Sequence, residues 1–317
     1  MGALIAARGR HTARVGEPCR AAGYIGRSRR HIDWKGALND AQPRHQQGVE
    51  RVSMKPLFLS GQRAFLRYIE VPGDDPPLLW LHGWQCSSTG ELLPAAVQPP
   101  LRGRRSLLID FLGHGYSDKP LDFGYALEDH ARTIVALIDS LELPACGLVG
   151  HSMGGGVAIH VAAARPQAVS LLVMAEGALG GDGEAPFDGQ PEEQYIEHGF
   201  PEMLEAQELE AAAHPTSLRA AHLGITRLIE PRAIFREAVS MSRRAEPSPL
   251  SLLAGLTMPR WHLRGELSAS APELIRDLAT IGVGSKTVPQ TGHPMGLQNP
   301  LGLASSLAEV ITESWPS

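Results

Sequence analysis

The sequence predicts an α/β fold in which helices cover both faces of a mostly parallel sheet. Short apolar runs predict the strands, at 78–83, 106–115, 146–152 and 169–177. Segments with helical patterning separate these runs, near 89–97, 125–142 and 154–166. Strands that are apolar on both sides belong to sheets with two covered faces, and helical connections are typical of parallel strands. The predicted class is therefore a doubly wound α/β domain.

Further elements complete the predicted sheet near both ends of the chain. The stretches PLFLS (56–60) and AFLRYIEV (64–71) are parted by a short turn and are typical of an antiparallel pair. Strand patterning returns at 258–266 and 285–293, and an amphipathic helix is predicted over about 300–314. The core domain is thus predicted to use both halves of the sequence.

The alternation of strands and helices stops at residues 177–250, which predicts a helical lid inserted in the core. The core itself is then made by 54–176 and 251–317. A loop begins the predicted lid, and helices follow around 190–212, 216–229 and 231–243.

The predicted lid is acidic in its first part. Eleven Asp or Glu residues and no Lys or Arg stand between Arg165 and Arg219. Such a run is usually a solvated helix face. A sharper interpretation is that its electric field disfavours anionic substrates.

Residues 1–53 differ from the rest of the chain in charge. They carry ten Lys or Arg against four Asp or Glu, net +6, whereas the other 264 residues carry −11. They show no apolar period and lack the apolar core of a secretory signal. We predict a disordered basic extension, with Met54 fitting the start of the folded sequence. An Arg-rich transit peptide is the alternative, which Asp33 and Trp34 fit poorly.

The composition argues against several classes of protein. A net charge of −5 argues against general nucleic-acid binding. No apolar stretch approaches the roughly 20 residues that cross a bilayer, so no membrane partner is expected. Cys19, Cys86 and Cys146 are scattered and odd in number, and they predict neither a disulfide framework nor a metal site. A reducing, cytoplasmic location is therefore expected. The sequence predicts no oligomeric state.

The stretch VGHSMGGG (149–156) places one serine among glycines directly after an apolar run. Its G-x-S-x-G pattern at a predicted strand–helix junction is typical of a nucleophile held in a sharp turn. Gly150 and Gly154 avoid collisions in that strained backbone. The N-terminus of the following helix favours an oxyanion. We therefore predict that Ser152 is a nucleophile; the alternative is a structural glycine-rich turn.

A serine hydroxyl needs a base to take its proton. His293, in QTGHP, follows the last predicted strand, where the base stands in the chain order Ser–acid–His. Other histidines have structural explanations because they lie in predicted helices, between helices or inside a strand: His130, His160, His222, His214 and His262.

The strand at 78–83 ends in His82-Gly83, and the glycine lets the next loop approach the nucleophile. The backbone N–H groups of Trp84 and Met153 are then the predicted oxyanion donors. We interpret His82 as a structural residue that holds this loop. Asp110 is interpreted as a carboxylate that stabilises a turn.

Four motifs, in their order and spacing, resemble the α/β-hydrolase superfamily: LLWLHGW, DFLGHGYSDKP, GLVGHSMGGGVAIHVAAARP and QTGHP. The resemblance covers roughly residues 56–314. It implies an eight-stranded, mostly parallel sheet with a cap domain at 177–250. It also implies a Ser–acid–His triad that uses no cofactor and no metal.

The triad acid departs from the commonest pattern of the superfamily. Members often carry Asp in a Gly-x-x-Asp stretch after the seventh strand, where this chain has Ser268, with Glu266 two residues earlier. Glu176 ends the sixth strand, where haloalkane dehalogenases and some serine hydrolases keep their acid. A Glu buried there needs a partner, which His293 would supply. We favour Glu176, with Glu266 as the alternative acid; a third reading is that Glu176 only ties down the lid.

These residues predict a serine hydrolase that cleaves a small or medium, largely apolar carboxylic ester through an acyl-enzyme. C–C bond, thioester or lactone hydrolysis and aminopeptidase action are alternatives on the same fold. A catalytically silent ligand-binding protein is the alternative outside enzymes. Apolar lid residues are candidates to line the pocket, although amphipathic helices bury such residues in any case: Phe187, Tyr195, Ile196, Phe200, Met203 and Leu204.

Overall fold

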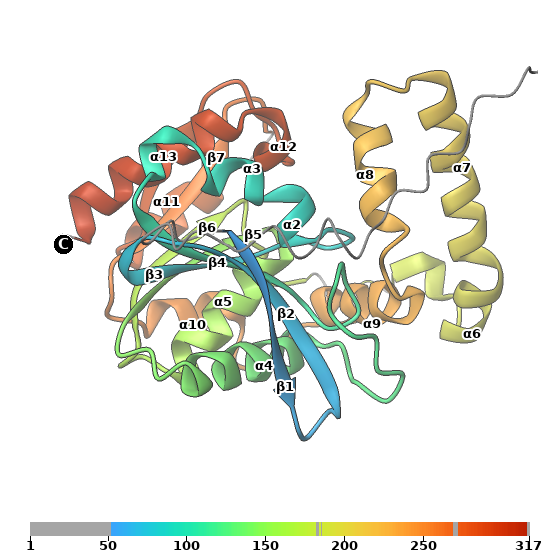
Figure 1. The fold of residues 1–317 in the computed structure, drawn as a ribbon, viewed down its shortest axis with the longest axis horizontal. Coiled ribbons are helices and arrows are strands. Elements are labelled where there is room, and N and C mark those ends of the chain that lie inside the picture. Colours follow the sequence, from blue (N-terminus) through green and yellow to red (C-terminus); the bar gives the residue numbers. More distant parts are fainter. Residues whose placement is uncertain (1–51, 182–183, 185, 269–271, 316–317) are drawn as a thin grey trace, which may run out of the picture. The chain divides into compact units, whose positions relative to one another are not determined.

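The computed structural model describes residues 52–315, except 182–183, 185 and 269–271. The predicted extension, 1–53, lies outside the described residues apart from its last two, so it stays a prediction. Within the described residues the chain forms an eight-stranded sheet with helices on both faces (Figure 1). The predicted α/β class is confirmed.

The strands follow the order β1-β2-β4-β3-β5-β6-β7-β8 across the sheet. β2 runs antiparallel to both β1 and β4, and all the other neighbouring pairs are parallel. The sheet is therefore mostly parallel, with the predicted antiparallel pair at one edge. The strands are β1 (Ser53–Leu59), β2 (Ala64–Val71), β3 (Asp74–Leu81), β4 (Arg104–Asp110), β5 (Cys146–His151), β6 (Val169–Ala175), β7 (Arg260–Gly265) and β8 (Gly284–Val288).

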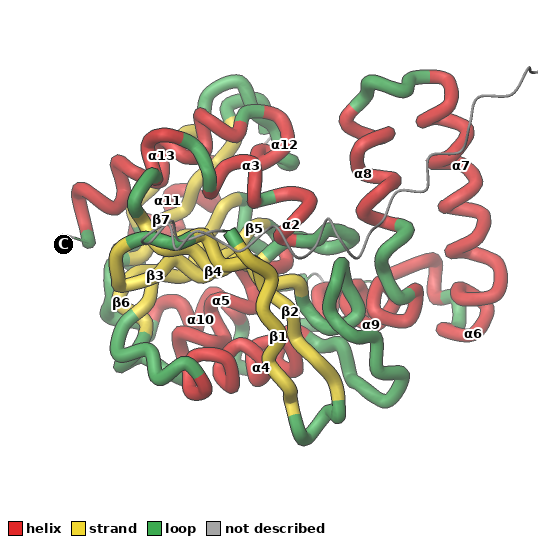
Figure 2. The backbone as a smooth tube through the Cα atoms, viewed as in Figure 1, coloured by secondary structure: helices red, strands yellow, loops and turns green. Residues whose placement is uncertain are grey.

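Two clusters of buried side chains hold helices against the two faces of the sheet. The first core cluster joins one face to α4 (Leu127–Ser140), α5 (Met153–Ala164), α10 (Pro249–Ala254) and α11 (Pro272–Thr280). The second core cluster joins the other face to α3 (Leu93–Ala96), η1 (Pro99–Leu101), α12 (Met295–Gln298) and α13 (Pro300–Ser314). Figure 2 shows α4, α5 and α10 on one side of the strands and α3 and α13 on the other.

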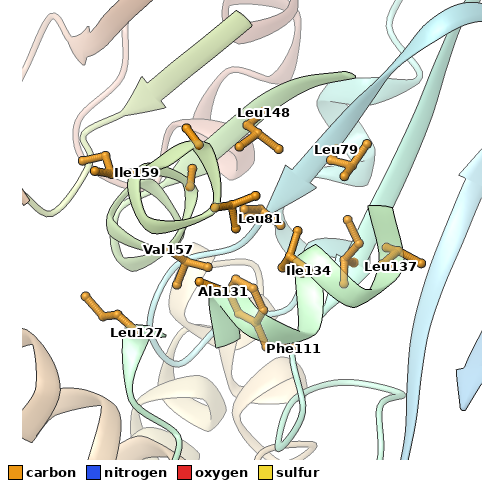
Figure 3. Packing of buried hydrophobic residues seen from close by; sticks show 14 of the residues in the cluster. Leu79, Leu81, Phe111, Leu127, Ala131, Ile134, Leu137, Leu148, Val157 and Ile159 are labelled. Atoms are coloured by element: carbon orange, nitrogen blue, oxygen red, sulfur yellow. The ribbon is translucent and has the colours of Figure 1, made fainter. Parts of the chain in front are cut away.

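The apolar run of β3 supplies both clusters. Leu79 and Leu81 belong to the first core cluster, where Figure 3 shows them near residues of α4 and α5. Leu78 and Trp80 belong to the second core cluster. Successive side chains of a strand point to opposite faces, so a strand covered on both sides is apolar at every position.

Between β6 and β7 the chain forms helices that are not part of the sheet layers. We call residues 186–242 the helical insert. It consists of η2 (Pro186–Gly189), α6 (Glu192–Gln194), η3 (Tyr195–Gly199), α7 (Phe200–Ala213), α8 (Leu218–Thr226) and α9 (Pro231–Ser242). The helices lie where the sequence predicts them. The division of the chain into a core and a lid at 177–250 stays a proposal.

Some helices differ from the sequence prediction. The helix expected near 89–97 is two short helices, α2 (Ser88–Glu91) and α3. Pro94 has no N–H for an i→i−4 hydrogen bond, so one continuous helix cannot form there. α10, α11 and α12 are helices that the sequence analysis does not predict.

Leu79 tests how far the core depends on one side chain. We expect Leu79→Ala to lower the free energy of unfolding by about 2–5 kcal/mol, because it removes buried methyl groups and leaves a cavity. Leu121→Ala is the matched control, because Leu121 is 61% exposed; it should change this free energy by about 0.5 kcal/mol or less. Urea unfolding followed by circular dichroism measures the free energy of unfolding of both variants. Equal losses in Leu79→Ala and Leu121→Ala would contradict the burial of Leu79 in the core.

Candidate active site

Ser152 stands in a strained turn between β5 and α5. Its φ of 49° is a positive value that residues other than glycine rarely adopt. A Cβ added to Gly154 would lie 2.2 Å from the carbonyl oxygen of Leu81. A Cβ added to Gly150 would lie 2.3 Å from the carbonyl oxygen of Gly154. The predicted steric need for both glycines is confirmed.

The loop after β3 passes directly against this turn. A Cβ on Gly83 would lie 3.3 Å from Ser152 Cβ and 2.8 Å from His151 Nδ1, so a larger residue does not fit. Trp84 follows, and its indole Nε1–H donates to the carbonyl oxygen of Ile234 on α9 at 3.0 Å. At the other side of Ser152, Met153 is the first residue of α5, where backbone N–H groups lack an acceptor within the helix.

His293 reaches the serine from the loop between β8 and α12. Its Nε2 lies 2.9 Å from Ser152 Oγ. Loss of water around the ring lowers the pKa of His293, and the charge of His151 lowers it further. Glu176 and Glu91 act in the opposite direction but do not outweigh these effects. At neutral pH the ring is therefore the free base, the form that accepts a proton.

The two candidate acids have different surroundings. Glu176 follows β6, accepts the backbone N–H of Gly265 at 2.7 Å, and acts on His293 through its charge. Glu266 is exposed and accepts the backbone N–H of Gln290 at 2.8 Å; it is not among the groups that act on His293. In the part of the chain that the structure describes, neither carboxylate bonds directly to His293. The electrostatics at His293 thus favour Glu176.

Two polar residues near the site have the structural roles that we predict. His82 Nε2 accepts the backbone N–H of Phe111 at 3.1 Å, and burial lowers the pKa of His82 to about 3. Asp110 accepts the backbone N–H groups of Thr89 and Tyr116 at 3.2 and 3.0 Å. Both side chains therefore hold loops in place.

A cavity of about 280 Å³ lies beside Ser152 and His293. Its walls include Trp84 and Leu297, and α8 contributes Leu218, Arg219 and His222. Most of the lid residues named from the sequence pack instead in an apolar cluster, against which Trp84 also packs: Phe187, Tyr195, Ile196, Phe200 and Met203. The side chains that the insert presents to the cavity thus come from α8.

The order of the strands agrees with the result of a sequence comparison. So do the positions of Ser152 and His293, which follow the carboxyl ends of the parallel strands β5 and β8. A family model described as "alpha/beta hydrolase fold" matches residues 76–222. The chain has the α/β-hydrolase fold. The matched stretch includes Ser152 and Glu176, whereas His293 lies beyond it.

Individual proteins with similarity to this α/β-hydrolase-fold chain have names that indicate different activities. The dihydrolipoyllysine-residue acetyltransferase component of the acetoin cleaving system from Pseudomonas putida is 38% identical over 119 residues, 36% of this chain and 31% of that protein. The 2-hydroxymuconate semialdehyde hydrolase from Pseudomonas sp. (strain CF600) is 38% identical over 99 residues, 31% of this chain and 35% of that protein. The chain thus spans about a third of the length of these curated relatives.

A solved structure of a thermophilic esterase from Thermogutta terrifontis is similar over 82% of this chain and 98% of that chain, with a TM-score of 0.66. The sequence identity is 20%, so this likeness shows the fold alone.

In the described part of this α/β-hydrolase-fold chain, no helix is long and apolar enough to cross a membrane. Over the same residues, no three His, Cys, Asp or Glu side chains are grouped so that they could hold a metal ion.

Arginines partly neutralise the acidic run of the helical insert. They come from α8, the turn after it, and α9, and the pairs are Glu210–Arg219, Glu208–Arg227, Glu192–Arg232 and Glu192–Arg236. Arg219 also lines the cavity. The charge at the cavity is therefore not uniformly acidic, which weakens the idea that the insert disfavours anionic substrates.

The sequence analysis misses a buried ion pair beside the site. His151 Nδ1 lies 2.6 Å from Glu91 Oε1, and both side chains are almost fully buried. Burial opposes both charges, yet their mutual attraction outweighs it, raising the pKa of His151 and lowering that of Glu91 to about 2. His151 stands inside the GHSMG motif, but its partner lies far away in the sequence, so spacing could not reveal the pair.

A second buried network joins α9 to the core. Glu237 Oε1 lies 2.7 Å from His114 Nε2 and 2.9 Å from His130 Nε2, and all three side chains are fully buried. Burial makes the His114 ring neutral, and because its Nδ1 donates to the carbonyl oxygen of Cys86 at 3.0 Å, its Nε2 carries the lone pair. Glu237 must then hold a proton to donate to it. Burial accordingly raises the pKa of Glu237 to about 7 and lowers that of His114 to about 3.

The Glu237 network predicts that the free energy of unfolding depends on pH. The native state keeps the Glu237 proton up to a pKa of about 7, whereas the ordinary value is 4.5. The stability linked to Glu237 is therefore fully present below about pH 4.5 and is lost as the pH rises through about 7. We expect the stability advantage of wild type over Glu237→Gln to shrink between about pH 5.5 and pH 8, measured by urea unfolding at each pH.

The matched control is Glu273→Gln, because the side chain of Glu273 is 82% exposed. Its difference from wild type should stay constant over the same pH range. A constant difference for Glu237→Gln as well would contradict the protonated form of Glu237.

Proposed function

We propose that the chain is a serine hydrolase that cleaves a small or medium carboxylic ester through an acyl-enzyme. The observation that carries the proposal is the 2.9 Å contact between Ser152 Oγ and His293 Nε2 at the strained turn. A nucleophile and base within hydrogen-bond reach, beside a cavity, are the minimum for acyl transfer. Hydrolase activity itself is part of the proposal.

The acylation step uses the proton that joins the two residues. His293 Nε2 takes the hydroxyl proton while Ser152 Oγ forms a bond to the ester carbonyl carbon. The carbonyl electron pair moves to oxygen, where the backbone N–H groups of Trp84 and Met153 are the proposed donors. As the tetrahedral intermediate collapses, the protonated His293 gives its proton to the departing alcohol.

Water then completes the reaction by the same route. His293 takes a proton from water, the hydroxide attacks the acyl-enzyme, and the returned proton restores Ser152 as the acid leaves. The imidazolium that forms in each half needs a nearby negative charge. We assign this role to Glu176, because its carboxylate acts electrostatically on His293 whereas that of Glu266 does not.

The cavity supports the substrate class. About 280 Å³ is at the low end for a small-molecule site and fits a short acyl group better than a long one. Leu218 and Leu297 give part of its wall an apolar character. We therefore propose an apolar ester of small or medium size as the substrate, with no cofactor.

C–C bond hydrolysis is the second candidate. It is favoured by the similarity to a protein named 2-hydroxymuconate semialdehyde hydrolase, which covers 35% of that protein. A serine hydrolase of either kind would use Ser152 and His293, so turnover of an ester and of a diketone-type substrate must be compared directly.

A cytoplasmic location also remains a proposal. Its support is that Cys86 and Cys146 are free, buried thiols, as expected in a reducing compartment.

Three variants test the triad. We expect Ser152→Ala to lower kcat/KM on p-nitrophenyl butyrate by about 10⁴-fold or more, and Glu176→Gln by about 10³- to 10⁴-fold. Glu266→Gln should keep a near-normal rate, because its carboxylate bonds the Gln290 backbone. Burst and steady-state kinetics measure these rates, and circular dichroism checks the folding of each protein.

The outcomes separate the alternatives. Loss of activity in Glu266→Gln, with a normal rate in Glu176→Gln, would show that the triad acid lies at the end of β7. If wild type hydrolyses esters no faster than Ser152→Ala, the esterase proposal is wrong. A panel of thioester, lactone, diketone and aminoacyl substrates would then identify another activity, and no turnover of any of them would indicate a catalytically silent binding protein.

The lowered pKa of His293 predicts the pH dependence of the reaction. The base must be neutral to accept a proton, and its pKa lies below the ordinary 6.5. The acid limb of kcat/KM is therefore expected to have its midpoint below pH 6.5, with activity lost as the pH falls through it. A midpoint above pH 6.5 in a pH-rate profile would contradict this environment for His293.

A further inference from the structure

One buried pair of charged side chains touches all three loops of the proposed machinery. The backbone N–H of Gly83, in the loop after β3, donates to Glu91 Oε2 at 3.2 Å. Glu91 Oε1 lies 2.6 Å from His151 Nδ1, next to Ser152 in the turn. His151 Nε2 lies 2.8 Å from the backbone oxygen of His293, in the loop after β8.

The contacts of His151 define its charge. Its Nδ1 faces a carboxylate oxygen and its Nε2 faces a carbonyl oxygen, and both of these atoms are acceptors. A neutral imidazole has only one N–H, so two facing acceptors favour the imidazolium. The charge of Glu91, 2.6 Å from Nδ1, favours the same form and raises the pKa of His151, so Glu91 is the counterion of that form.

We propose that Glu91 and His151 are positioning residues: a buried charged pair that fixes the His293 loop against the Ser152 turn. The inference rests on the proposed function for its effect on rate. It goes beyond that function because neither residue forms a bond to the reacting atoms.

The loop of His293 is held to this pair in two places. Besides the bond to its own backbone oxygen, α12 packs on α2 so closely that a Cβ on Gly296 would lie 2.6 Å from the carbonyl oxygen of Glu91. The rings of His151 and His293 lie 4.9 Å apart between centroids, at 51°. At that distance a charge on one ring disfavours a charge on the other.

The groups that face the two rings set the direction of the effect. Glu91 on α2, Glu176 after β6 and the ring of His82 after β3 face His151. His151, Glu176 and Glu91 act on His293, and the effect of His151 there is larger than that of Glu91. Without Glu91, burial favours neutral His151. His293 then loses the effect of the His151 charge and the effect of the Glu91 charge. The effect of His151 is the stronger of the two and lowers the pKa of His293, so its loss makes that pKa rise.

The first measurement is made on the wild-type protein by histidine-selective ¹⁵N and ¹³C NMR. The resonances of His151 and His293 are assigned by their loss in His151→Gln and His293→Gln. We expect both nitrogens of His151 to be protonated at pH 7. A neutral His151 at that pH would overturn the inference, whether or not any variant folds.

The second measurement compares variants that differ in charge but little in shape. We expect the pKa of His293 to rise in Glu91→Gln and in His151→Gln. The glutamine amide at 151 can still donate to the His293 carbonyl, so this variant removes the charge while it keeps the contact. Glu237→Gln is the matched control, because it also replaces a buried carboxyl group that contacts histidine, but one that is not among the groups acting on His293.

Kinetics complete the test. On p-nitrophenyl butyrate we expect Glu91→Gln to lower kcat by about 10- to 100-fold with a smaller change in KM, because misplacement of the base costs rate. The acid limb of its kcat/KM profile should move to higher pH. A purely structural pair would lower the melting temperature of both variants and leave kcat, the acid limb and the pKa of His293 unchanged, which would overturn the inference.

Failure of the two proposals can be told apart. Absence of ester turnover in wild type would remove the proposed function, while the NMR values would still decide the charge of His151 and its effect on His293. Normal turnover with an unmoved pKa of His293 would remove only the positioning role.

Discussion

The close approach of three backbone segments at Ser152 is the constraint on which the rest of the site depends. Gly154 lies against the last carbonyl groups of β3, Gly150 lies against the start of α5, and Gly83 lies against the serine itself. Each contact leaves no room for a Cβ. Because the segments meet so closely, the nucleophile, the candidate oxyanion donors and the start of α5 have fixed relative positions before any substrate binds. This is the preorganisation that acyl transfer needs.

The buried histidines near this turn differ in their hydrogen-bond partners and therefore in their charge. His82 accepts a backbone N–H and is buried without charge, and His114 faces a protonated carboxyl group. At His151 the neighbouring carboxylate raises the pKa, whereas burial lowers the pKa values of His82 and His114 to about 3. Burying a charge is costly unless a counterion and hydrogen bonds offset it, so the chain buries one paired imidazolium and leaves the other two rings neutral. Local partners, more than depth of burial, decide which histidine is charged.

The sequence predicted the parts of the molecule that local patterns encode. Fully apolar strands such as β3, the turn at Ser152 and the helices of the insert all follow from periodicity or from steric rules within a few residues. The Glu91–His151 pair could not be found in this way, because its members meet only when α2 folds over the end of β5. The pocket wall escaped prediction for a similar reason. Apolar residues of α7 and of α8 look alike in sequence, and tertiary packing decides that α8 faces the cavity.

Trp84 belongs to two parts of the structure at once. Its backbone lies in the loop that faces Ser152, while its indole is tied to the carbonyl of Ile234 on α9. With Trp84 N–H as the proposed oxyanion donor, the helical insert and the chemical step share a residue. A bulky ligand that displaces α9 also displaces the donor, so it is penalised at the transition state even when its ground-state binding is good. Discrimination between substrates would then be expressed mainly in turnover, with affinity as a poor guide to what the protein accepts.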